Sequence, residues 1–88
     1  MAYTVEISEG LDKKFLKLRK KNPQQLRIIF KKIYQIKHTP YHFKPLRGSL
    51  KNVWRVHIDK HFVLTYTILE SSKTIRFLDF AHHDVVYE

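Results

Sequence analysis

Apolar and polar residues alternate with a period of two in four separate stretches of the chain, and this period predicts β-strands. The first stretch covers residues 3–7, where Tyr3, Val5 and Ile7 alternate with polar residues. The other three lie in the second half of the chain, at residues 53–58, 62–68 and 75–80. The turn-like segments 59–61 and 71–73 are short enough to connect these strands as hairpins.

Between the first and second strands, apolar residues recur with the period of an α-helix in two consecutive stretches. Ser8 is a candidate N-cap for the first helix, and Asn22 followed by Pro23 ends it and begins the second. The second helix is expected to stop near His38, because the residue before Pro40 avoids helical geometry. The residues predicted to face inward are Leu11, Phe15 and Leu18 in the first helix, and Leu26, Ile29, Phe30, Ile33 and Ile36 in the second.

Together these elements predict an α+β fold with the order β-α-α-β-β-β, in which a helical hairpin packs on one face of an antiparallel sheet. We expect residues 1–88 to form a single domain, because a chain of 88 residues has no room for a second core. Trp54 and Val56 point toward the helices in this arrangement, whereas Arg55 and His57 point away. No predicted element remains to cover that second face, so we expect it to be the binding surface.

The composition excludes several classes of protein. Hydrophobic residues make up 43% of the chain, enough for a packed core. The chain has no cysteine, which excludes disulfides and thiolate metal sites and favours a reducing, cytoplasmic location. It also lacks an apolar run of about 20 residues, so we expect no membrane partner.

The distribution of charge indicates a polyanionic partner. The formal net charge is +9, and 14 of the 17 Lys and Arg residues lie between Lys13 and Ile58, a segment without Asp or Glu. Such segregation favours binding of nucleic acid or a ribonucleoprotein over a merely solvated basic surface.

The available side chains are compatible with metal-free cleavage of RNA. The spacing of the six histidines matches no structural zinc site, and the nearby cations would repel a metal ion. RNA carries its own nucleophile in the 2′-hydroxyl, so a protein needs only imidazoles to move protons and cations to neutralise the phosphate. From the residues alone, a nuclease and a non-enzymatic basic nucleic-acid-binding module remain about equally open.

A motif at residues 45–57, Pro-Leu-Arg-Gly-Ser-Leu-Lys-Asn-Val-Trp-Arg-Val-His, resembles the RelE/ParE toxin superfamily. The resemblance continues through Leu64-Thr65-Tyr66 and Ile75-Arg76-Phe77 to the segment 80–87, Phe-Ala-His-His-Asp-Val-Val-Tyr. Within the superfamily the motifs are similar to those of the RelE-type mRNA interferases of the YafQ-like branch.

This resemblance implies the toxin of a type II toxin–antitoxin system, acting as a ribosome-dependent endoribonuclease that cleaves mRNA in the A site. It further implies 2′-OH attack without metal or cofactor. The implied partners are the ribosome, mRNA and a cognate, partly acidic antitoxin of the RelB/DinJ type. Two alternatives stay open: a ParE-like gyrase poison of the same fold, and the non-enzymatic module.

The resemblance also assigns roles to individual residues. It implies that His83 is the general acid and that Tyr87 positions the substrate, whereas His57, Lys44 and His61 compete for the role of general base. Arg55 completes the implied catalytic set by supplying charge at the phosphate. The implied substrate-binding residues are Arg47, Lys51, Lys60, His61, Phe62 and Arg76.

Overall fold

The computed structural model describes residues 2–45 and 52–86. Along the chain its elements are β1 (Thr4–Ile7), α1 (Glu9–Lys21), α2 (Pro23–His38), β2 (Lys44–Pro45), β3 (Val53–Ile58), β4 (Phe62–Leu69), the 3-10 turn η1 (Glu70–Ser72), β5 (Thr74–His82) and α3 (His83–Val86). The predicted α+β class and the predicted order of the main elements are confirmed. Three of the implied site residues, Arg47, Lys51 and Tyr87, lie outside the described residues.

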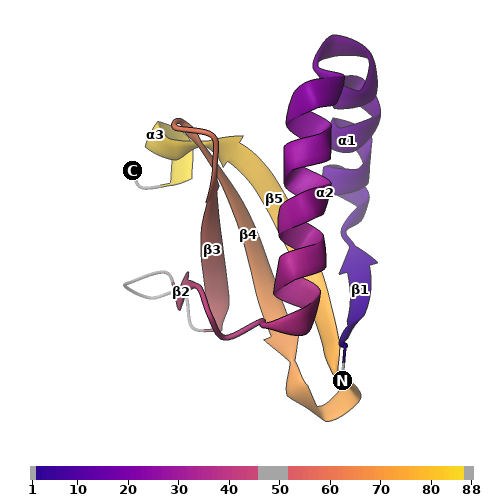
Figure 1. The fold of residues 1–88 in the computed structure, drawn as a ribbon, viewed down its shortest axis with the longest axis vertical. Coiled ribbons are helices and arrows are strands. Elements are labelled where there is room, and N and C mark those ends of the chain that lie inside the picture. The colour runs from indigo at the N-terminus through magenta and orange to yellow at the C-terminus, as the bar shows by residue number, and fades with distance from the viewer. Residues whose placement is uncertain (1, 46–51, 87–88) are drawn as a thin grey trace.

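The strands form one sheet in the order β1-β5-β4-β3-β2, and α1 and α2 lie together on one of its faces (Figure 1). The predicted antiparallel pairing holds from β2 through β5. β1, however, pairs in parallel with β5, so the complete sheet is mixed. Parallel neighbours need a long connection, and here the whole chain between β1 and β5 provides it.

Both helices begin where the sequence predicted, because a polar side chain caps each one. The Ser8 hydroxyl accepts the backbone N–H of Leu11 at 3.3 Å, and the Asn22 side-chain oxygen accepts that of Gln25 at 3.1 Å. Asn22 also closes α1 by donating its own N–H to the carbonyl of Leu18 at 2.8 Å. A single residue thus ends one helix and starts the next, which fixes the tight helical hairpin.

The core lies between the helical hairpin and the sheet. Of the predicted inward positions, Leu18 and Leu26 are partly buried against the core and Phe30 is 49% exposed, whereas the others are buried. Phe30 meets the buried ring of Phe15 edge-on, with 5.5 Å between ring centroids. Position 30 is about 100° around the helix from the buried Ile29, which takes its side chain to the outer side of the hairpin. The buried cluster comprises Leu11, Phe15, Ile29, Ile33, Ile36, Val56, Ile58, Leu64, Tyr66, Ile75, Phe77 and Phe80.

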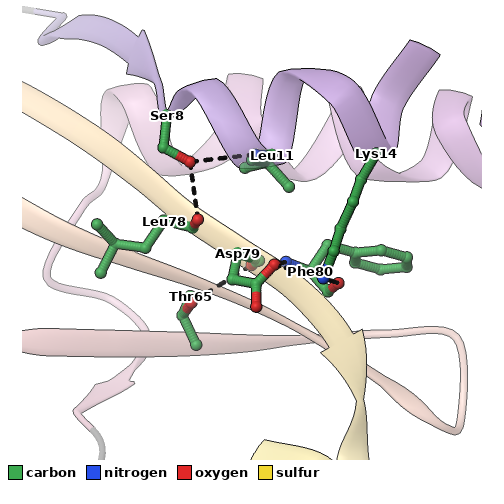
Figure 2. A network of polar contacts seen from close by, with 7 residues as sticks. All are labelled: Ser8, Leu11, Lys14, Thr65, Leu78, Asp79 and Phe80. Atoms are coloured by element: carbon green, nitrogen blue, oxygen red, sulfur yellow. Dashed lines mark hydrogen bonds and ion pairs between the residues drawn. The ribbon is translucent and has the colours of Figure 1, made fainter. Parts of the chain in front are cut away.

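The start of α1 covers the edge of β5 beyond the end of β1 (Figure 2). An uncovered strand edge presents unpaired backbone groups, which are costly when buried and prone to pairing with other chains. Ser8 donates its backbone N–H to the Phe77 carbonyl at 3.0 Å and its hydroxyl to the Leu78 carbonyl at 2.8 Å. Lys14 donates to the Phe80 carbonyl at 2.9 Å. These contacts lock the hairpin onto the sheet in one register.

The second face of the sheet is not left entirely open, as the sequence had suggested. α3 folds back against β4 and β5, and Val63, whose side chain lies on this face, is fully buried. The prediction of an uncovered face is therefore wrong at this end, because the residues after β5 form a helical turn and not an extended terminus. Figure 1 shows α3 beside the turn between β3 and β4.

No helix among the described residues combines the length and apolar character that crossing a membrane requires.

Candidate active site

The structure brings His57 and His83 together, although 25 residues separate them in the sequence. Their rings stack with centroids 5.7 Å apart and planes inclined by 27°. β3 supplies His57, whose side chain is exposed, and His83 is the first residue of α3. The backbone N–H of His83 donates to the His61 carbonyl at 2.6 Å, which ties α3 to the turn between β3 and β4.

The surroundings of His57 favour its neutral form. Partial burial lowers the pKa of His57 below its usual value of 6.5, and the positive charges of Arg55 and His83 lower this pKa further. Arg55 lies two residues back on β3, on the same face of the sheet. A neutral imidazole near pH 7 has a ring nitrogen that accepts a proton, so His57 has the protonation state of a base.

Asp84 places a carboxylate beside His83. One carboxylate oxygen lies 3.7 Å from Nδ1 of His83, and the other lies 3.7 Å from Nδ1 of His82. Each imidazole forms an ion pair with this carboxylate when it is protonated. The site thus contains a neutral proton acceptor next to an imidazole whose charged form has a counter-ion.

A second pair of stacked imidazoles adjoins the first. His61 and His82 are parallel to within 1°, with ring centroids 5.9 Å apart. Phe62 meets His82 edge-on at 5.5 Å and stacks on Phe80 at 5.1 Å. The family resemblance implied no site role for His82. Its position directly before His83 was the available signal.

Phe62 does not join the His57–His83 pair. Its neighbour Val63 lies directly opposite His57 in the β3–β4 register, and successive side chains on a strand point to opposite faces. Phe62 therefore lies on the helix-covered face and packs against the core, where it is half-buried.

The remaining described candidates fall into two groups. Lys60 and His61 are exposed in the β3–β4 turn, whose His61 carbonyl binds the N–H of His83. The backbone of Lys44 pairs with that of Arg55, two residues before His57 on β3. Arg76, in contrast, lies on β5 seven residues before His83. At the rise per residue of an extended strand, this spacing corresponds to roughly 20 Å. Its Nε donates to Glu6 at 2.8 Å, across the β1–β5 pair.

Within residues 2–45 and 52–86, no three His, Asp or Glu side chains converge in a way that could hold a metal ion.

Comparison with known proteins assigns this chain to a family. The family model of the ParE toxin of the type II toxin–antitoxin system parDE matches residues 5–87. The candidate toxin RelE4 of Methanocaldococcus jannaschii is 46% identical over 86 residues, covering 98% of this chain and 92% of that protein.

Two solved toxin–antitoxin complexes contain similar chains. The RelBE2 complex of Mycobacterium tuberculosis has a chain with a TM-score of 0.79 and 22% identity, covering 94% of this chain and all of that one. A chain of the Escherichia coli DinJ–YafQ complex has a TM-score of 0.75 and 20% identity over the full length of both chains. At these identities the likeness concerns the fold.

Proposed function

Because this chain belongs to the ParE toxin family of type II toxin–antitoxin systems, we propose that it is a toxin that cleaves mRNA. In this proposal it acts in the cytoplasm as a ribosome-dependent endoribonuclease that cuts mRNA in the A site. The observation that carries the proposal is the His57–His83 pair, in which two imidazoles from distant parts of the chain lie side by side. A neutral base and a proton donor on one surface are what metal-free RNA cleavage requires.

In the proposed reaction His57 takes the proton of the RNA 2′-hydroxyl, and the 2′-oxygen attacks the adjacent phosphorus. The bond from phosphorus to the 5′-oxygen breaks, and His83 donates its proton to this leaving oxygen. The products are a 2′,3′-cyclic phosphate and a 5′-hydroxyl end. Arg55, beside His57 on the same face, stabilises the negative charge that develops on the phosphate.

The outer part of the site is proposed to hold the mRNA. We propose that Lys44, Lys60 and His61 bind the phosphates on either side of the cut. Arg47, Lys51 and Tyr87 keep the roles that the family resemblance implies. The contact of His57 with the proposed general acid, His83, favours His57 over Lys44 and His61 as the general base.

Primer extension on mRNA with purified ribosomes tests the proposal. We expect the wild-type protein to cut in the A site, and His83→Ala to reduce the rate by about 100-fold or more, the usual contribution of a general acid. His38→Ala, a change at an exposed histidine at the end of α2, serves as the control and keeps the wild-type rate. Intact mRNA after incubation with active, folded wild-type protein would contradict the proposal.

A second candidate is favoured by the identity of the family model, which is that of ParE. In this alternative the protein poisons DNA gyrase, and the histidine pair has no catalytic role. A gyrase supercoiling assay separates the two functions, because only a gyrase poison inhibits supercoiling in the absence of ribosomes. A chain inactive in both assays but able to bind RNA would be the non-enzymatic module.

The outer surface of the helices is proposed to bind the cognate antitoxin. Leu16, Phe30 and Tyr34 are exposed there by 56%, 49% and 67%, and Arg27 and Lys31 border the hollow beside the two aromatic rings. This combination favours an amphipathic segment with acidic residues beside its apolar ones. The partner we propose is therefore a partly acidic antitoxin of the RelB/DinJ type.

A further inference from the structure

The turn that carries His83 depends on an unusual cap. The first N–H groups of a helical turn have no acceptor within the helix, and Ser, Thr, Asp or Asn side chains normally supply one. At the start of α3 the acceptor is a histidine: the backbone N–H of Asp84 donates to Nδ1 of His82 at 3.2 Å. His82 is the last residue of β5, directly before His83.

The ring of His82 is held in place on two sides. His61 lies parallel to it at 5.9 Å, and Phe62 contacts it edge-on at 5.5 Å. Phe62 is itself stacked on the buried ring of Phe80. A chain of aromatic contacts thus leads from the core to His82 and restricts its rotamer, so Nδ1 points at a defined position.

From these contacts we propose that His82 is a positioning residue, whose neutral imidazole caps α3 and thereby holds His83 against His57. The inference rests on the proposed function for its catalytic consequence, but the placement of His83 is a structural claim. The contacts that position His83 include the cap at the adjacent Asp84 and the bond from its own N–H to the His61 carbonyl. Loss of the cap leaves the Asp84 N–H to bind water in place of His82, and it removes a contact that holds the first turn and His83 in place.

The cap requires one protonation state. Nδ1 accepts a hydrogen bond only in the neutral tautomer that carries its proton on Nε2. In the protonated ring Nδ1 becomes a donor, and its available partner is then the Asp84 carboxylate at 3.7 Å. Within the described part of the chain, the titratable groups in contact with the His82 ring are His61 from the β3–β4 turn and Asp84 from α3. Protonation therefore exchanges the backbone cap for a side-chain ion pair.

Two substitutions at position 82 distinguish the effect of losing the hydrogen-bond acceptor from the effect of losing the aromatic ring. His82→Asn places an amide oxygen close to the position of Nδ1 and keeps the acceptor, whereas His82→Phe keeps a ring and removes the acceptor. We expect His82→Asn to cleave mRNA within about threefold of the wild-type rate. For His82→Phe we expect kcat to fall by about 10- to 100-fold with little change in KM, as for a small displacement of a catalytic group.

NMR titration of His57 provides a readout that does not depend on catalysis. The neighbouring charge of His83 is one of the causes that lower the pKa of His57. In His82→Phe, where His83 is released, the pKa of His57 should rise toward its usual value, and in His82→Asn it should stay lowered. If His82→Phe does not fold, His82→Gln, whose acceptor lies one methylene further out, replaces it.

The outcomes are distinguishable. A His82→Phe protein with wild-type activity and an unchanged His57 titration would overturn the proposal, as would a His82→Asn protein that loses as much as His82→Phe. If the wild-type protein cleaves no RNA, the proposed function fails, and the His57 titrations still decide whether His82 positions His83.

Discussion

At the scale of single residues, His57 lies where partial burial and neighbouring positive charge both oppose its protonation. The sequence predicted that His57 points away from the helices, because residues on a strand alternate between faces. It did not predict the contact with His83, which depends on how the chain turns after β5. Desolvation lowers the pKa of His57 most, and the charges of Arg55 and His83 lower this pKa further.

The lowered pKa of His57 predicts a pH dependence of stability. As the pH falls through the ordinary histidine value of 6.5, the unfolded chain binds a proton at this position before the folded chain does. The stability that depends on neutral His57 is complete above 6.5 and is lost as the pH falls through the lowered folded-state value. We expect the wild-type Tm to fall more than that of His57→Asn between about pH 7 and about pH 5.

Thermal unfolding followed by circular dichroism at constant ionic strength measures this difference. His38→Asn is the control, because it also removes one histidine but leaves His57 in place, and it should keep the wild-type dependence. Parallel Tm profiles for the wild-type protein and His57→Asn would show that the His57 pKa is not lowered in the folded state.

At the scale of elements, Glu70 connects three segments that are far apart in the sequence. Its carboxylate accepts hydrogen bonds from Tyr3 at 3.0 Å and Tyr41 at 2.5 Å, and it forms an ion pair with Lys73. Tyr41 also meets Trp54 edge-on, with ring centroids 5.4 Å apart. The connection between β4 and β5 thus holds both the N-terminal residues and the loop that leads from α2 into β2.

This arrangement predicts that Glu70→Gln loosens the loop after α2. The hydrogen bonds from Lys73, Tyr41 and Tyr3 lower the pKa of Glu70 to about 2. The stability they provide is present above the ordinary value of 4.5 and is lost as the pH falls toward 2. The variant should therefore have a lower Tm at neutral pH and a weaker loss of stability on acidification.

Trp54 is the only tryptophan of the chain, so its fluorescence reports on the Tyr41 contact directly. We expect a changed emission spectrum for Glu70→Gln. Glu9→Gln, which makes the same change of charge at the start of α1, should leave the spectrum as in the wild type. Identical Tm and emission for Glu70→Gln and the wild type would mean that this cluster does not hold the loop.

At the scale of the whole molecule, positive and negative charges occupy different parts of the fold. Three acidic residues outside the basic segment pair with cations: Glu6 with Arg76, Asp79 with Lys14, and Glu70 with Lys73. The helical hairpin carries basic residues along its length and has acidic residues only in the first turn of α1. The unbalanced charge of the protein is therefore presented largely by the helices.

This segregation predicts salt-dependent binding to ribosomes through the outer side of α2. Replacing Arg27 and Lys31 together by Gln should weaken binding and reduce the slope of log affinity against log salt by about two, one for each lost phosphate contact. Sedimentation with ribosomes at several salt concentrations measures the slope. Arg76→Gln is the control, because Glu6 already neutralises Arg76, and it should change the slope little. An unchanged slope for the double variant would exclude this surface from contact with ribosomal RNA.

The sequence by itself determined the two long helices, the four main strands and most of the positions that they bury. The alternation around Val56, the helical spacing around Ile29 and the helix caps are local signals. Each depends only on residues within a few positions of one another. Tertiary structure alone decided the parallel pairing of β1 with β5, the return of α3, the placement of Phe62 against Phe80 and the cap that His82 provides. The physical reason is range: a period reports which side of an element is apolar, whereas a site forms where chain segments far apart in sequence are brought together by packing.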